Sequence, residues 1–279
     1  MEISFESRAT MHLETIVEHW RLRGGRLVFL TGAGISAESG IPTFRGSDGF
    51  WRVGSKNYAP MDLATRAMFD RDPELVWSWY LARFAACAAA TPNAGHRAIA
   101  QIQAAYGDRV ALVTQNIDGL HFRAGSPPER SFAIHGDARL VRCALGCAAV
   151  MTPIPAVEPA APEKRLSTRT RDLLRCARCS SWMRPHVLWF DEMYDEHNYR
   201  SESALSAARS ASLLVTVGST GATTLPMRIA LECHARAVPI IDINIEENPF
   251  AQLADECGHS VRETATTALP RIATLLGVS

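Results

Sequence analysis

The sequence lacks a net charge, and it lacks a long apolar run. Its 279 residues include 29 basic and 29 acidic side chains, so the charge balance does not favour nucleic acid or anionic lipid as a partner. No apolar stretch approaches the roughly 18 to 20 residues that a membrane-spanning helix needs. The first 20 residues hold no uninterrupted apolar segment, which argues against a secretory signal. We therefore expect a cytoplasmic protein that binds no membrane and makes no direct contact with nucleic acid.

Two common nucleotide-binding signals are missing as well. The chain has no Gly-Lys-Ser/Thr triplet, the mark of the usual loop for nucleoside triphosphates. A dehydrogenase-type site needs an acidic residue at the end of the second strand, about 20 residues beyond its glycines. Asp48 lies near that distance from the glycine-rich turn at residues 32–37, but in a loop. Either the chain binds a dinucleotide in another manner, or this turn serves another purpose.

The segment 27–44, LVFLTGAGISAESGIPTF, joins a short apolar run to this glycine-rich turn. Gly32, Ala33 and Gly34 lie where a buried strand would lead into a helix. Backbone amides and the helix dipole face an anion at such a turn, and glycine lets the backbone approach it closely. Glycine motifs of this kind also occur by chance in many loops. The motif alone is therefore weak evidence for a phosphate-binding turn.

Three further apolar runs predict buried parallel strands, at residues 109–114, 212–217 and 237–243. Small or polar residues follow each run, at the strand ends where ligands of open α/β sheets bind. Helical patterns occupy residues 94–106 and 202–211. This alternation predicts an α/β fold with a Rossmann-like, doubly wound parallel sheet.

Four of the seven cysteines form two close pairs, and the pairs predict a metal site. Zinc takes four ligands in a tetrahedron, and thiolates two or three residues apart can share one ion. Disulfides are the alternative, which a cytosolic setting disfavours. A closed four-thiolate site is structural rather than catalytic. We expect one structural zinc, with these ligands: Cys143, Cys147, Cys176 and Cys179.

Two inserts are expected to interrupt the sheet. One is a helical module at residues 52–90, and the other is a zinc-ribbon-like module at residues 141–183. The large, dinucleotide-binding domain is then built from residues 1–51, 91–140 and 184–279.

A series of short motifs follows along the chain. They are GAGIS at 32–36, ESGIP at 38–42, FR at 44–45, TQNIDGLH at 114–121, HG at 135–136, the two cysteine pairs, RPHV at 184–187, GST at 218–220 and IN at 243–244. In this order they resemble the sirtuins, which are NAD-dependent protein deacylases. The resemblance implies NAD as the cofactor and acylated-lysine proteins or peptides as substrates. It also implies that the zinc-ribbon module and the helical module together form a small domain beside the Rossmann-like domain.

The resemblance also implies a role for each matched residue. His135 is expected to be the general base, and Asn116 and Asp118 are expected to act in catalysis beside nicotinamide and its ribose. The peptide is expected to add as a strand beside residues 187–190, in contact with Val187 and Phe190. The expected cofactor-binding residues are Gly32, Ala33, Gly34, Phe44, Arg45, Gln115, Asn116, Asp118, Gly218, Ser219, Thr220 and Asn244.

Histidine suits the role of base because its ordinary pKa lies near neutrality. From its surroundings alone, at a strand or turn end, His135 is better explained as a capped or core histidine, and it is the resemblance that favours the role of base. His96, His121 and His186 have the same bland interpretation, and none of them is chosen as the base.

A finer resemblance concerns the acyl group. Tyr80 and Arg83 match the Tyr-x-x-Arg pair of the sirtuin branch that removes succinyl and malonyl groups. A spacing of three residues places both side chains on one helix face, where arginine can grip a carboxylate with two hydrogen bonds and tyrosine can add one. A surface arginine beside a core tyrosine is the alternative. The resemblance implies a preference for succinyl- or malonyl-lysine, with some deacetylase activity.

Asp191 departs from the family pattern, since many sirtuins have glycine there, and it leaves the peptide preference open. Other functions also remain open. A mono-ADP-ribosyltransferase or an NAD hydrolase would use the same NAD pocket, and so would a non-catalytic NAD-sensing module.

Overall fold

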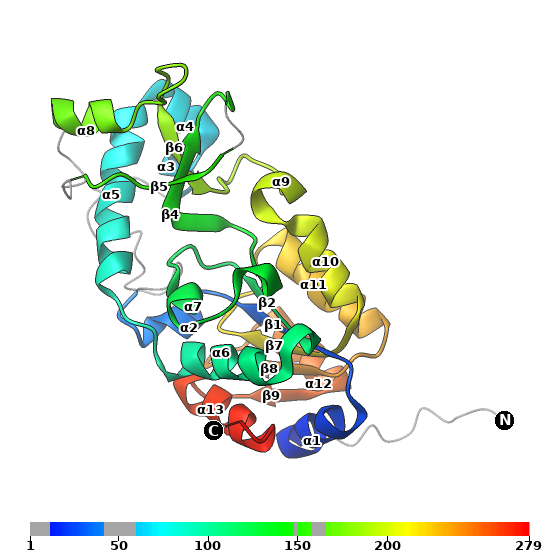
Figure 1. The fold of residues 1–279 in the computed structure, drawn as a ribbon. Coiled ribbons are helices and arrows are strands. Elements are labelled where there is room, and N and C mark those ends of the chain that lie inside the picture. The colour runs from blue at the N-terminus through cyan, green and yellow to red at the C-terminus, as the bar shows by residue number, and fades with distance from the viewer. Residues whose placement is uncertain (1–11, 42–59, 148–149, 158–165, 279) are drawn as a thin grey trace.

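The computed structural model describes residues 12–41, 60–147, 150–157 and 166–278 (Figure 1). Phe44 and Arg45, two of the expected cofactor-binding residues, lie outside these ranges. Two sheets organise the described chain, a six-stranded sheet in the order β3-β2-β1-β7-β8-β9 and a three-stranded sheet in the order β5-β4-β6. None of the helices within the described ranges is long and apolar enough to cross a membrane.

All strand pairs of the larger sheet are parallel. Side chains alternate across it, with Leu27 and Phe29 facing one layer of helices and Val28 and Leu30 facing the other. The chain order reverses between β1 and β7, which makes their carboxyl ends the switch point where ligands of such sheets bind. The strands are β1 (Arg26–Thr31), β2 (Val110–Thr114), β3 (Ser131–Ala133), β7 (Ala211–Val217), β8 (Ile240–Ile243) and β9 (His259–Val261).

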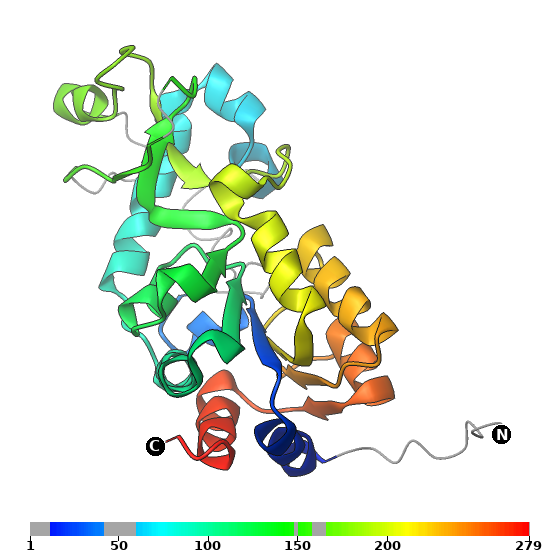
Figure 2. The same cartoon turned by 45° about the vertical axis from the view of Figure 1, so that its right-hand side comes forward.

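Helices cover both faces of this sheet, as Figures 1 and 2 show. One face packs against α1 (Leu13–Arg23), α6 (Ala94–Tyr106) and α13 (Ala265–Leu275). The other face packs against α10 (Ser201–Arg209), α11 (Thr224–Ala235) and α12 (Pro249–Cys257). The predicted doubly wound α/β fold is confirmed.

The smaller sheet belongs to a second core, drawn above the first in both figures. This core is rich in aromatic side chains, among them Trp77, Trp79, Tyr80 and Trp189. The division of the chain between two domains stays a prediction. The elements are β4 (Gly136–Cys143), β5 (Thr152–Pro153), β6 (Met183–Val187), α3 (Pro60–Leu63), α4 (Arg66–Arg71), α5 (Pro73–Ala89) and α8 (Thr168–Leu173).

Some predicted boundaries are wrong by one to three residues. Arg109 lies in the 3-10 turn Gly107–Arg109 rather than in β2. The strand expected from residue 237 begins at Ile240, because Ala237 has a φ of 53° and Pro239 has no amide to donate. The helix expected to reach residue 211 ends at Arg209.

The remaining short elements are α2 (Gly34–Ala37), α7 (Leu120–Arg123), the 3-10 turn Pro128–Arg130 and α9 (Glu196–Tyr199).

Candidate active site

Three glycines bring two loops into backbone contact at the switch point of the sheet. Gly32 and Gly34 follow β1, and Gly218 follows β7. A Cβ atom on Gly34 would lie 2.6 Å from the Gly218 Cα atom, and one on Gly32 would lie 2.8 Å from the Gly218 carbonyl oxygen. The Gly34 amide donates to that carbonyl over 2.8 Å, so this N–H is not available to a phosphate. The glycines are required by the packing of the two loops.

Asn116 and Asp118 are buried just beyond the end of β2. The Asn116 side-chain amide donates to the Gly32 carbonyl over 2.9 Å and to the Ser36 hydroxyl over 3.2 Å. Ser36 in turn donates to the Asp118 carboxylate over 2.7 Å, and the Leu120 amide donates to it over 2.8 Å. Burial raises the pKa of Asp118 above its ordinary value, although these hydrogen bonds oppose the rise. Both side chains are thus fixed in orientation by the fold.

Two buried histidines lie behind this pair. His96 Nε2 is 3.4 Å from the Ser36 hydroxyl, and His121 Nε2 is 3.0 Å from the Thr31 hydroxyl. The two rings meet edge to face at 4.8 Å. Burial lowers the pKa of His96 to about 4 and holds the pKa of His121 well below its ordinary value. Both are therefore neutral groups that support the buried hydrogen-bond network from inside.

His135 lies in the turn between β3 and β4 and is half-buried. Its Nδ1 is 3.0 Å from the Gln115 carbonyl oxygen, which can only accept, so Nδ1 carries the proton. Its Nε2 therefore holds the lone pair and lies 2.8 Å from the Tyr194 hydroxyl. Burial lowers the pKa of His135 to about 4, against the opposing effect of the bond to Gln115. The ring is neutral at pH 7, and only Nε2 can take up a proton.

The Gln115 side chain connects the β2 end to the β7 end of the sheet. Its Nε2 donates to the Ser219 hydroxyl over 2.8 Å, and its Oε1 accepts from the Thr223 hydroxyl over 2.9 Å. The Asn244 side chain, beyond β8, donates to the Ser219 carbonyl over 3.0 Å. Thr220 follows Ser219 and is exposed. The structure therefore brings the expected cofactor-binding residues of three strands to one edge.

Tyr80 and Arg83 both lie on buried faces of α5, so Arg83 is not a surface residue. Their exposed fractions are 1% and 6%. The Tyr80 hydroxyl accepts from Trp189 Nε1 over 2.9 Å, and the Arg83 guanidinium lies 4.6 Å from the centre of the Trp79 ring. Burial lowers the pKa of Arg83 to about 10 and raises that of Tyr80 to about 12. At neutral pH the pair is a buried cation beside a neutral phenol.

The chain leaving β6 forms the edge expected to bind a peptide. Val187 is buried, while Phe190 is 52% exposed. The Asp191 carboxylate accepts hydrogen bonds from two backbone amides, that of Arg66 over 2.7 Å and that of Ala67 over 3.0 Å. The carboxylate therefore caps the first turn of α4 and ties this edge to the helical module.

The four paired cysteines converge at one point of the small sheet. Their Sγ atoms all lie within 4.8 Å of one another, with 3.6 Å between Cys143 and Cys179 and 3.4 Å between Cys147 and Cys176. All four are free thiols. A tetrahedral zinc with a Zn–S bond of about 2.3 Å needs sulfurs roughly 3.8 Å apart. The cluster fits a closed structural zinc site.

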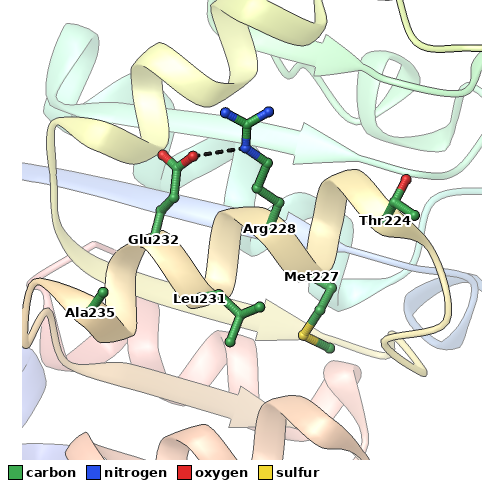
Figure 3. A pocket seen from close by; sticks show the side chains of 6 residues that line it. All are labelled: Thr224, Met227, Arg228, Leu231, Glu232 and Ala235. Atoms are coloured by element: carbon green, nitrogen blue, oxygen red, sulfur yellow. Dashed lines mark hydrogen bonds and ion pairs between the residues drawn. The ribbon is translucent and has the colours of Figure 1, made fainter.

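A shallow hollow runs along α11, but its chemistry is limited (Figure 3). Its two charged side chains, Arg228 and Glu232, pair over 2.9 Å. Glu232 also accepts from Arg209 over 3.1 Å. The hollow has no charged group left for catalysis. Its lining residues are Thr224, Met227, Arg228, Leu231, Glu232 and Ala235.

Three residues of the site have no role in the sequence analysis: Ser36, Tyr194 and Thr223. Ser36 lies inside the GAGIS motif, and that position is the signal that could have identified it. Tyr194 lies 59 residues beyond His135, and Thr223 lies 108 residues beyond Gln115. No local spacing indicates contacts over such separations.

Known proteins resemble this chain over most of its length. A family model described as the Sir2 family matches residues 32–224. An NAD-dependent protein deacylase of Leptospira interrogans is 35% identical over 243 residues, which are 87% of this chain and 90% of that protein. The mitochondrial NAD-dependent protein deacylase sirtuin-5 of Danio rerio is 36% identical over 265 residues, covering 88% and 82% of the two chains.

Solved structures agree with these relatives. A Sir2 homologue in complex with NAD is similar with a TM-score of 0.79 and 32% sequence identity. The similarity covers 97% of this chain and 96% of the other. Together with the six-stranded parallel sheet and the four-cysteine cluster, these matches show that the chain belongs to the Sir2 family, the sirtuins.

Proposed function

We propose that this protein is an NAD-dependent protein-lysine deacylase, which transfers the acyl group to ADP-ribose and releases nicotinamide. The observation that carries the proposal is the convergence of His135 with the buried pair Asn116 and Asp118 at the switch point of the sheet. His135 has one ring nitrogen able to take up a proton. The deacylases of Leptospira interrogans and Danio rerio support the assignment.

The polar groups fit a dinucleotide because they lie at the ends of β1, β2, β7 and β8, on both sides of the switch point. NAD supplies the ribose that accepts the acyl group. Gln115, Asn116 and Asp118 would hold the nicotinamide end, and Ser219 and Asn244 would hold the adenosine ribose. His135 would accept a ribose hydroxyl proton at Nε2.

We further propose that the acyl pocket favours succinyl- and malonyl-lysine over acetyl-lysine. Arg83 is a buried cation among aromatic rings, and a carboxylate at the end of an acyl chain would neutralise it. Tyr80 would add a hydrogen bond. Trp189 joins Tyr80 to the edge beside Val187, so the pair lies next to the place where an acyl-lysine would enter.

The general assignment is tested by nicotinamide release with and without an acylated peptide. A deacylase releases one nicotinamide for each acyl group removed, and almost none when the peptide is left out. Release at the same rate without peptide would instead favour an NAD hydrolase or an ADP-ribosyltransferase. NAD binding with no release in either case would favour an NAD-sensing module.

The acyl preference is tested with acetyl-, malonyl-, succinyl- and longer acyl-lysine peptides, read by mass spectrometry. Arg83→Met should lower succinyl removal by about 100-fold and change acetyl removal by less than about threefold. Arg71→Met, at the exposed end of α4 in the same module, is the matched control and should leave the ratio unchanged. Equal losses on both peptides with Arg83→Met would contradict the preference.

A further inference from the structure

Tyr194 contacts the one nitrogen of His135 that can accept a proton. Since the Gln115 carbonyl fixes the proton on Nδ1, the Tyr194 hydroxyl must donate to Nε2, over 2.8 Å. The two ring centres lie 5.8 Å apart. A neutral imidazole nitrogen has a single lone pair, so it accepts one strong hydrogen bond at a time. A substrate hydroxyl that gives its proton to His135 needs that same lone pair.

The loop that carries Tyr194 is fastened on both sides. Asp191 is bound to the first amides of α4, and Asp195 caps α9 by accepting the Asn198 amide over 2.7 Å. The Tyr194 ring packs against the apolar cluster under the sheet, whereas Met193 beside it is 85% exposed. The fold therefore places the Tyr194 hydroxyl on Nε2 of His135.

Apart from Tyr194, the charged and titratable groups on the elements around His135 are engaged elsewhere. Within the described ranges, none of them forms a hydrogen bond or an ion pair with its ring. The pairs are Asp137 with Arg139, Glu192 with Arg184, Asp118 with Ser36, Asp191 with the α4 amides, Asp195 with Asn198, Arg142 with Tyr199, and His186 stacked on Tyr199. The protonation of His135 is thus set by its burial and by its two hydrogen bonds.

We propose that Tyr194 is a positioning residue, which occupies the lone pair of His135 until NAD binds and then yields it to the ribose hydroxyl. The proposal rests on the proposed function, because it takes His135 as the base. The contact stabilises the neutral form of the ring and holds Nε2 in place. Burial raises the pKa of Tyr194 to about 12, so its hydroxyl remains a donor at neutral pH.

The first test is an NMR titration of His135 in the protein without NAD, comparing wild type with Tyr194→Phe. A bond donated to the neutral ring lowers the pKa, so losing it should raise the His135 pKa by about half to one pH unit. Tyr199→Phe is the matched control, because the Tyr199 ring also lies beside a histidine, stacked on His186 at 5.5 Å. It should leave His135 unchanged. An unchanged His135 pKa in Tyr194→Phe would overturn the proposal.

The second test is NAD binding by calorimetry together with steady-state kinetics. NAD no longer has to displace the hydroxyl in Tyr194→Phe, so it should bind about fivefold more tightly, with kcat changed less than about threefold. A 100-fold loss of kcat at unchanged NAD affinity would show a proton relay instead and overturn the proposal. Titration and calorimetry need no acyl transfer. A wild-type protein that binds NAD but removes no acyl group would therefore contradict only the proposed function.

Discussion

The two sides of the candidate site are held together in different ways. One side is the line of carboxyl ends of the parallel strands, called the sheet edge below. There Ser36 hydrogen-bonds to both Asn116 and Asp118, and Asn116 also bonds to the backbone, deep in the protein. In the predicted small domain, Arg83 lies among aromatic rings, and four cysteines cluster at one point of the smaller sheet. The first region is completed by its own side chains, whereas the second fits a metal ion and, under the proposed function, a carboxylate.

The difference separates two kinds of control over one reaction. Under the proposed function, the network fixed by the fold acts on every substrate alike, because it would face the cofactor and not the acyl chain. The proposed acyl pocket would act on the choice of substrate, because it would touch only the acyl chain. Changes at the sheet edge should therefore alter rates for all acyl groups, and changes in the small domain should alter stability or selectivity.

Removal of the metal should have the largest effect. Cys176→Ser, or treatment with a strong chelator, should abolish zinc binding and lower activity by about 100-fold or more, because structural zinc contributes folding energy directly. Limited proteolysis should then cut the small domain and spare the parallel sheet. Cys257→Ser, far from the cluster in sequence, is the control for metal content. Full activity and an uncut small domain after zinc removal would contradict the comparison.

Ser36→Ala should lower the rate of deacylation without changing the selectivity between acyl groups. The substitution removes the hydroxyl that donates to Asp118 and accepts from Asn116. We expect kcat/KM to fall by about 10- to 100-fold on acetyl and succinyl peptides alike, since one strong buried hydrogen bond to a charged group is lost. A change in the ratio between the two peptides would show that the two regions are not separate.

Low pH should lower the free energy of unfolding, because the buried histidines behind the sheet edge are held neutral in the folded state. The folded-state pKa of His96 is about 4, below an unfolded value near 6.5. The unfolded chain therefore binds the proton first, and stability present above pH 6.5 is lost as the pH falls toward 4. The free energy of unfolding in urea should drop by about 1 to 2 kcal/mol between pH 6.5 and 5 from His96 alone. His96→Gln should flatten this dependence. A stability that stays constant over that interval would contradict the burial argument.

The smallest effect is expected at the contact between the peptide edge and α4. Asp191→Ala removes a carboxylate that accepts hydrogen bonds from two backbone amides. This loss should lower the free energy of unfolding by about 1 kcal/mol. Hydrogen exchange at Arg66 and Ala67 should become faster. Asp70→Ala, which breaks an exposed ion pair of the same helix, should have a smaller effect. Equal effects of the two substitutions would show that Asp191 does not fasten this edge.

Much of the fold could be predicted because the central strands are short apolar runs. β3 and β9 escaped prediction, since each has only three residues and shows no periodicity. The cysteine cluster and the residues of the strand-end loops could be predicted from local motifs. The bonds from Ser36 to Asp118 and from Tyr194 to His135 span 82 and 59 residues. They follow from the order of the strands and the course of the loops, which no local pattern encodes.

His135→Ala tests the central claim most directly, with acyl transfer from acetyl and succinyl peptides measured at saturating NAD. Loss of a general base should lower product formation by at least about 100-fold on both peptides. NAD affinity should stay within about threefold, since the other cofactor-facing residues are intact. If His135→Ala kept more than about a tenth of the wild-type rate, another group would have to remove the proton, and the account of this site would be contradicted.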